Sequence, residues 1–279
     1  MPPKKQTPKV EEKTIPAEKI AEKVKVEAVE EVVKEVIPTV PVEAPMGVEI
    51  KKEFDKEAWQ PKTVVGMKVK RGEITNIDQI LDAGLPILEA SIVDALLPNL
   101  ESDLLGIGQS KGKFGGGKTS IWRQVQKKTA EGNKPSFAAL VVVGNRDGYI
   151  GLGYGKARET LPGREKAFRK AKLNMIKVQR GCGSWECGCG GNHSIPCKIV
   201  AKCGSVVVEI LPAPKGTGLA MEKEAAKILT LAGIKDVYSR TYGQTRTKLN
   251  HIKAIFEALR LLSQVKIKPQ AKKTQNKEQ

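Results

Sequence analysis

Between residues 77 and 178, apolar positions predict three helices. Ile77–Leu81 and Ile87–Leu97 predict two short helices, and residues 84–86 separate them because glycine and proline interrupt helices. Arg164–Val178 predicts a longer helix with an apolar side and a basic side. The apolar side of this helix consists of Ala167, Phe168, Ala171, Met175 and Val178.

A second pattern, typical of strands, lies between the short helices and the longer one. Three segments show strand-like alternation or a continuous apolar run, and a polar turn separates each from the next. They predict an antiparallel three-stranded meander, with the longer helix covering one face of its sheet. The strands are Ser120–Lys128, Phe137–Val143 and Tyr149–Gly153, and the turns are Thr129–Pro135 and Gly144–Gly148.

Strand-like alternation resumes after a segment rich in glycine and cysteine. The odd positions from Ile195 to Cys203 are apolar and lysines alternate with them, so we expect Cys197 and Cys203 to lie in the core. The order of elements beyond them predicts a second domain, and the fold class of the chain is α+β. These elements are a strand at Val206–Leu211, a helix at Met221–Ala232 ended by Gly233, a strand at Lys235–Ser239 and a helix at Lys248–Leu262.

Positive charge is concentrated in the part of the chain that carries these patterns. The 279 residues include 48 Lys and Arg against 31 Asp and Glu, a net charge of +17. Residues 1–50 hold 8 Lys and 10 Glu and predict a disordered or transiently helical extension, so residues 51–279 carry +19. The basic tail at 264–279 either lies along phosphates or is simply solvated. This balance predicts a polyanionic partner.

Several classes of protein are excluded. The apolar runs are far shorter than the ~20 residues that span a bilayer, so we expect no transmembrane helix and no membrane partner. The N-terminus lacks the apolar core of a secretory signal, which predicts a reducing, cytoplasmic setting for the five cysteines. Aromatic residues make up 4% of the chain, which disfavours an aromatic-lined ligand pocket.

Two glycine-rich segments suggest nucleotide-binding enzymes. Gly112–Thr119 satisfies the phosphate-loop formula, but a phosphate loop opens a helix, whereas the residues from Ser120 onward alternate like a strand. The favoured interpretation is a Gly/Lys loop on RNA phosphates, and an NTPase is the alternative. The glycines from Gly148 to Gly155 lack dinucleotide-binding spacing, and we expect them to permit close approach of a helix or of nucleic acid. His251 is expected to be a surface or packing residue, and no catalytic residue is predicted.

One cluster points to metal chemistry. Cys182, Cys187, Cys189 and His193 offer three thiolates and an imidazole, the donor types that zinc binds in a tetrahedron. Intervening glycines permit the tight turns through which such donors converge. One interpretation is a structural zinc that orders the connector at 182–194, with Cys197 as a fifth candidate ligand. The other is a set of unmetallated thiols or a redox pair.

Residues 58–263 resemble the universal small-subunit ribosomal protein five family. The run from Arg123 to Ala157 resembles its first domain, and four short motifs resemble its second domain. The segment Cys-Gly-Ser-Trp-Glu-Cys-Gly-Cys and the helices predicted within 78–100 resemble the archaeal branch. The four motifs are Cys203-Gly-Ser-Val, Leu211-Pro-Ala-Pro-Lys-Gly-Thr-Gly-Leu219, Leu231-Ala-Gly-Ile and Thr241-Tyr-Gly-Gln-Thr.

The resemblance implies a fold and a set of partners. A double-stranded-RNA-binding-like domain within 51–181 would be followed, after the 182–194 connector, by a βαβ-type domain with a left-handed crossover at 195–263. Both would bind small-subunit rRNA near the decoding region and the mRNA entry, with ribosomal proteins four and three as neighbours. The implied function is structural, with an effect on translational accuracy. A free-standing, zinc-dependent RNA-binding regulator is the alternative.

The family pattern also assigns residues. The surface toward protein four, which affects accuracy in the family, maps to the segment Lys202, Cys203, Gly204 and Ser205. The first 50 residues and the Gly106–Thr119 insertion have no clear family counterpart. The cations expected to bind rRNA are Lys118, Arg123, Lys127, Lys128, Lys134, Arg146, Lys156, Arg158, Lys215, Arg246 and Lys248.

Overall fold

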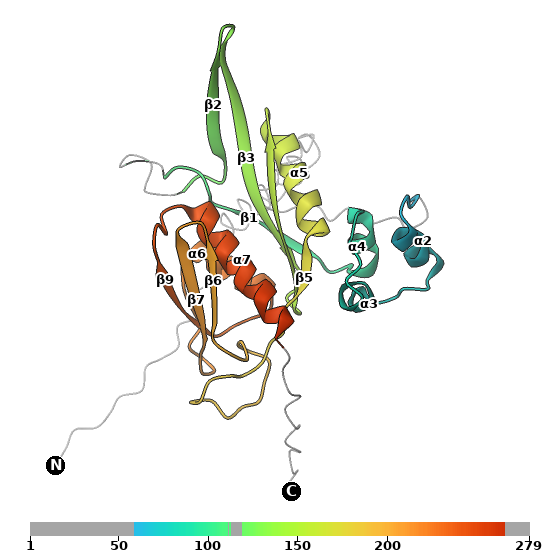
Figure 1. The fold of residues 1–279 in the computed structure, drawn as a ribbon, viewed down its shortest axis with the longest axis vertical. Coiled ribbons are helices and arrows are strands. Elements are labelled where there is room, and N and C mark those ends of the chain that lie inside the picture. The colour runs from blue at the N-terminus through green and yellow to red at the C-terminus, as the bar shows by residue number, and fades with distance from the viewer. Residues whose placement is uncertain (1–58, 111, 113–118, 266–279) are drawn as a thin grey trace, which may run out of the picture. The chain divides into compact units, whose positions relative to one another are not determined.

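The computed structural model describes residues 59–110, 112 and 119–265, beginning with three short helices (Figure 1). These are α2 (Val64–Arg71), α3 (Ile77–Asp82) and α4 (Ala90–Leu96). Helix α3 confirms the prediction, whereas α4 begins three residues later than predicted. The reason is that Glu89 is extended and its carboxylate accepts the backbone N–H groups of Lys62 and Thr63, at 2.8 and 2.6 Å. Helix α2 was not predicted, although Thr63 and Gly72 cap its two ends.

The first sheet has five strands, of which the predicted meander forms the middle. Strand β3 (Gly132–Gly144) pairs with β4 (Tyr149–Ala157) on one side, and on the other with β2 (Arg123–Thr129) and then β1 (Glu101–Leu105). Strand β5 (Met175–Lys177) pairs with the far edge of β4. The meander is therefore confirmed, while β1 and β5 are additions that the sequence pattern did not indicate.

The hairpin of β2 and β3 is longer than predicted. The expected seven-residue turn at 129–135 is wrong, because Thr129 pairs with Gly132 and only residues 130 and 131 connect the strands. Residues 132–135 and almost all of β2 are exposed, so the first residues of β3 have no buried face and no apolar pattern that would mark them as a strand. Figure 1 shows this hairpin projecting beyond the rest of the sheet.

Helix α5 (Thr160–Leu173) lies across β3 and β4, as predicted for one face of the sheet, but its boundaries differ. The prediction of a helix through Val178 is wrong, because the chain leaves the helix at Asn174 and Met175 begins β5. Met175 is buried from β5, in a separate cluster with residues of the N-terminal helices. Its apolar character therefore reflects burial in that cluster and not a continuation of α5.

Glycines on β4 allow α5 to approach the sheet closely. A Cβ atom on Gly151, Gly153 or Gly155 would lie within 2.2 Å of a carbonyl oxygen of the α5 backbone. The facing positions on α5 are also small, namely Ala167 and Ala171. Of the two expectations for these glycines, close approach of a helix is the one that the structure shows.

The second sheet has the order β6-β7-β9-β8. Its antiparallel strands are β6 (Ile199–Cys203), β7 (Val206–Pro212) and β9 (Val237–Tyr242), and the short β8 (Leu219–Ala220) pairs with β9 in parallel. Helix α6 (Lys223–Leu231) connects β8 to β9, and α7 (Lys248–Gln264) packs on β6 and β7. The predicted order of elements is confirmed with β8 added, although β6 begins at Ile199 rather than Ile195. Cys197 and Cys203 are half-buried and pack against the core rather than within it, so the prediction for them is only partly correct.

One core joins the two sheets. Leu140 and Val142 of β3 belong to the same buried cluster as Ile228 of α6 and Ile255 of α7. The alternate residues Val141 and Val143 face α5 instead. This part of β3 is covered on both faces, which explains its continuous apolar run. No helix in the described ranges is long and apolar enough to cross a bilayer.

Candidate nucleic-acid interface and metal centre

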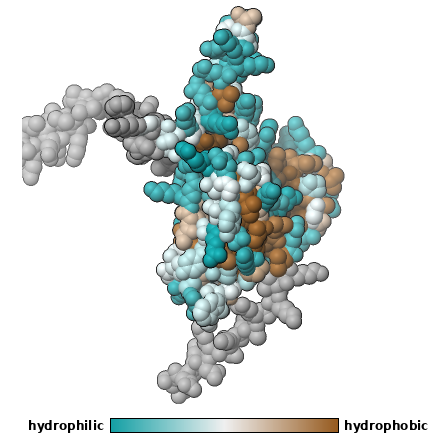
Figure 2. Space-filling view, turned by 60° about the vertical axis from the view of Figure 1, so that its left-hand side comes forward, coloured by the Kyte–Doolittle hydropathy of each residue, from teal (hydrophilic) through white to brown (hydrophobic). Residues whose placement is uncertain are grey.

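The projecting β2–β3 hairpin presents a group of exposed cations. Arg123, Lys127, Lys128 and Lys134 are all exposed on it, and its visible face is largely hydrophilic (Figure 2). Lys127 and Lys134 are direct cross-strand partners, and Lys134 forms an ion pair with Glu131 at 2.8 Å. Like charges placed opposite each other destabilise a hairpin, and Glu131 balances only one of the two lysines, so a bound anion would relieve the remaining repulsion.

A polar cavity of about 520 Å³ connects the base of the hairpin to the start of α7. Three of the predicted cations, Arg123, Arg246 and Lys248, line it together with Trp122. Lys248 forms an ion pair with Glu222 at 3.2 Å and donates to the Thr119 hydroxyl at 3.1 Å. The fold thus brings together positions 123 and 246–248, which are more than a hundred residues apart in the sequence.

The remaining predicted cations have varied surroundings. Arg146 forms an ion pair with Glu101 at 2.8 Å, which holds its guanidinium against β1. Lys156 and Arg158 are exposed near the end of β4, and Lys215 is exposed in the loop after β7. Lys118 lies outside the described residues, as do residues 1–58, the tail from 266 onward and most of the phosphate-loop match.

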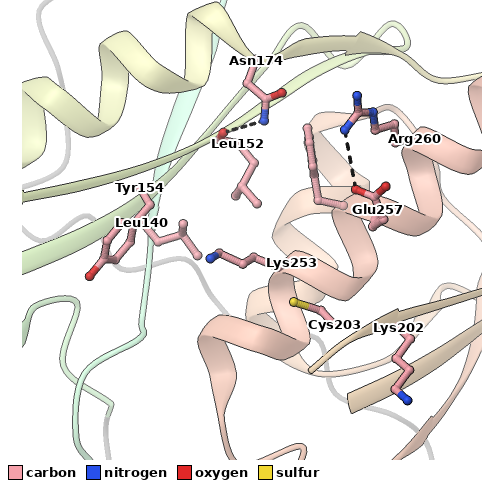
Figure 3. Close-up of a pocket in the computed structure, with 10 residues that line it drawn as sticks. Leu140, Leu152, Tyr154, Asn174, Lys202, Cys203, Lys253, Glu257 and Arg260 are labelled. Atoms are coloured by element: carbon pink, nitrogen blue, oxygen red, sulfur yellow. Dashed lines mark hydrogen bonds and ion pairs between the residues drawn. The ribbon is translucent and has the colours of Figure 1, made fainter. Parts of the chain in front are cut away.

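The predicted surface toward protein four forms the turn between β6 and β7. Lys202, Gly204 and Ser205 are exposed and Cys203 is half-buried. Lys202 and Cys203 also line a cavity of about 440 Å³ between the two sheets, where Lys253 reaches from α7 toward Leu140 and Tyr154 (Figure 3). The sequence prediction missed this cation and Arg260, because both lie on α7, far from the β6–β7 turn in sequence.

The structure brings the four predicted metal ligands together. The ligand atoms of Cys182, Cys187, Cys189 and His193 all lie within 4.8 Å of one another, and Cys187 Sγ is 3.7 Å from His193 Nε2. Ligand atoms around a tetrahedral zinc lie roughly 3.6–3.8 Å apart, so small movements would close this cluster on a metal. Cys197 packs on the core and is not part of the cluster.

The electrostatics of the cluster favour one thiolate. The backbone N–H of Lys215 and the neighbouring thiols lower the pKa of Cys187 to about 6. Burial and the neighbouring thiols raise the pKa of Cys182 to about 11. Crowded thiols cannot all ionise without a cation between them, and three cysteines with one histidine are the donor set of a closed structural zinc site.

Both histidines have carboxylate partners that the sequence prediction missed. His193 Nδ1 lies 2.8 Å from the buried Asp236 Oδ2, and His251 Nδ1 lies 2.8 Å from Glu222 Oε2. His251 is buried, so of the two expectations for it, packing is the observed one. Each partner lies about 30 or more residues away along the chain, where neither periodicity nor motif spacing indicates a pair.

Comparison with known proteins identifies the family. Residues 121–179 match the family described as ribosomal protein S5, N-terminal domain, and residues 201–274 match ribosomal protein S5, C-terminal domain. The chain is 52% identical over 213 residues to the small ribosomal subunit protein uS5 of Nanoarchaeum equitans, covering 76% of this chain and 91% of the relative. The chain belongs to the ribosomal protein S5 family.

Other S5 relatives match equally broadly. The small ribosomal subunit protein uS5 of Methanocaldococcus jannaschii is 52% identical over 210 residues, which cover 75% of this chain and 90% of that protein. The protein of the same name from Methanosphaera stadtmanae is 50% identical over 213 residues, with 76% and 87% covered. The predicted resemblance is therefore confirmed.

Membership in the S5 family settles two further predictions. S5 proteins are structural components without enzymatic activity, which confirms that the chain is not an enzyme and rejects the NTPase alternative. The predicted location in the small ribosomal subunit is confirmed as well.

Proposed function

We propose that this constituent of the small ribosomal subunit binds rRNA chiefly through the β2–β3 hairpin and the polar cavity at its base. The supporting observation is a projecting hairpin that buries neither face and carries Lys127 and Lys134 as cross-strand partners. Such a hairpin gains little from packing, whereas its lysines can neutralise closely spaced phosphates and release their counterions. Phosphate and shape recognition also agrees with the low aromatic content.

Hairpin binding can be tested by salt dependence. In a Lys127→Gln, Lys128→Gln double variant, we expect weaker binding to purified small-subunit rRNA. The slope of log K against log salt should fall by about 0.7–0.9 for each phosphate that the variant no longer neutralises. The matched control is a Lys62→Gln, Lys68→Gln double variant on exposed positions at the start of the described chain. Equal slopes for the hairpin variant and the unchanged protein would contradict the proposal.

The proposed fold of the two modules follows the family. A helix packed across one face of an antiparallel meander supports a double-stranded-RNA-binding-like module within 51–181. The parallel β8–β9 pair joined by α6 supports a βαβ unit within 195–263, for which we propose the left-handed crossover of the family. The 182–194 connector lies between these modules.

We further propose that the Lys202–Ser205 turn contacts ribosomal protein four near the decoding region, with protein three and the mRNA entry close by. The exposure of this turn supports the proposal. If subunit closure on a cognate codon breaks this contact, its strength sets part of the energy of closure. Each change of about 1.4 kcal/mol in the contact would then shift the closure equilibrium tenfold.

Accuracy provides the test of this contact. We expect Lys202→Glu to weaken it, to ease closure and to raise readthrough of stop codons in cells whose ribosomes carry the variant. The control is Lys198→Glu, which makes the same charge change at an exposed position before β6. Unchanged readthrough in ribosomes that assemble normally with Lys202→Glu would refute the proposed contact.

We also propose that the Cys182, Cys187, Cys189 and His193 cluster holds a structural zinc. Support comes from the donor set, the mutual distances and the lowered pKa of Cys187. When bound, zinc would replace repulsion between thiolates with four ligand bonds and would order the connector.

A further inference from the structure

Asp236 connects the proposed zinc centre to a distant loop. It is buried immediately before β9, and its Oδ2 atom lies 2.8 Å from His193 Nδ1. The other ring nitrogen of His193 faces Cys187 Sγ at 3.7 Å. The histidine therefore stands between a carboxylate and the cluster, which is the arrangement of a metal-binding histidine oriented by an outer carboxylate.

The second oxygen of Asp236 holds the loop that carries Lys215. Oδ1 accepts the backbone N–H groups of Gly216 at 3.1 Å and Gly218 at 2.9 Å. Both glycines have positive φ angles, 94° and 75°, so this loop has a shape that other residues rarely adopt. Further along the same connection, the Ser194 hydroxyl accepts the Ala213 N–H at 3.2 Å.

A second contact joins the connector to the same segment, because Ser194, the residue after His193, accepts the Ala213 N–H. Two contacts thus join the region of the metal ligands to residues 213–218, one through Asp236 and one through Ser194. Because Asp236 Oδ2 faces Nδ1 of His193, a proton on Nδ1 leaves the lone pair of Nε2, which faces Cys187, for a metal.

We propose that Asp236 is a positioning residue that holds His193 in the orientation that binds zinc. Through the same carboxylate, zinc binding orders the 213–218 loop. Lys215 in this loop then contacts RNA effectively only in the zinc-loaded protein. This inference rests on the proposed zinc centre and on the proposed RNA binding. A purely structural Asp236, which only anchors the loop, would leave the zinc affinity unchanged.

Zinc affinity separates the two roles. The full-length protein and an Asp236→Asn variant are titrated with zinc in competition with a chromophoric chelator. We expect the variant to bind zinc about 10–100-fold more weakly. The control is Asp78→Asn, which removes another hydrogen-bonded carboxylate, paired with Tyr149 and Lys177 away from the cluster, and should keep the wild-type zinc affinity. Wild-type affinity in a folded Asp236→Asn variant would overturn the proposal.

The coupling to the loop is tested in the unmodified chain, which avoids dependence on a variant that fails to fold. Amide hydrogen exchange at Gly216 and Gly218 should speed up at least tenfold when a chelator removes zinc, while amides of β3 stay protected. Unchanged exchange at both glycines would overturn the proposal. An unmodified protein that binds no zinc would refute the zinc centre itself, and this inference with it.

Lys215 supplies the RNA readout. Affinity for purified small-subunit rRNA is compared between the unmodified chain and Lys215→Gln, first with zinc and then after chelation. We expect a several-fold loss with zinc and a much smaller loss without it. An equal loss in both states would overturn the coupling while leaving RNA binding itself intact.

Discussion

Replacing Gly153 with alanine is expected to destabilise the protein by about 3 kcal/mol or more, because the new methyl group would collide with the backbone of α5. The Cβ atom would lie 2.1 Å from the Ala167 carbonyl oxygen and 2.3 Å from the Ala171 nitrogen. The nearest atoms belong to the α5 backbone and not to a flexible side chain, so α5 would have to move away from the sheet. Urea unfolding followed by circular dichroism would measure the loss, which is a large part of the usual 5–15 kcal/mol.

A control for this variant lies on the facing helix. A Cβ atom on Gly163 would meet its nearest neighbours at ordinary distances of 3.5–3.8 Å. Gly163→Ala should therefore leave the stability unchanged or raise it by up to about 1 kcal/mol, because alanine favours the helix. If Gly153→Ala unfolded at the same urea concentration as the unmodified chain, the close contact between α5 and β4 would be disproved.

Loss of the proposed zinc is the second change for which we expect a large effect, here on the stability of the 182–194 connector. Native mass spectrometry of the full chain should show one bound zinc, and Cys187→Ser should lose it, because serine cannot supply the thiolate that the Lys215 N–H stabilises. Zinc binding contributes about 10–16 kcal/mol in zinc-finger peptides, so loss of the metal should open the 182–194 connector to proteases.

Cys197→Ser is the matched control for the zinc measurement. Cys197 lies close in sequence but packs on the core outside the cluster, so this variant should retain its zinc. Loss of zinc from both cysteine variants, or from neither, would contradict the assignment of ligands.

Hydrophobic periodicity predicts most elements of this fold, because most elements bury one face. The alternation from Ile199 to Cys203 and the apolar run before Gly144 both correspond to strands. Periodicity fails where no face is buried, as at residues 132–135, the start of β3. It also fails at Met175, whose helical spacing continues past the end of α5 although the residue belongs to β5.

The sequence likewise reveals some residues of the candidate sites and not others. The metal ligands lie within twelve residues of each other, so their spacing reveals them, whereas Asp236 joins them only through tertiary folding. A sequence also does not show which cations are already paired. Arg146, Lys248 and Lys134 form ion pairs with Glu101, Glu222 and Glu131, and only the structure shows these pairs.

The core shared by the two sheets has a consequence for synthesis of the chain. Leu140, Val142 and Ile150 leave the translating ribosome long before α6 and α7, the helices that cover them. Until the last helix emerges, the nascent first sheet exposes an apolar face that invites aggregation. Production of this protein therefore depends on keeping the incomplete chain soluble until α7 has been synthesised.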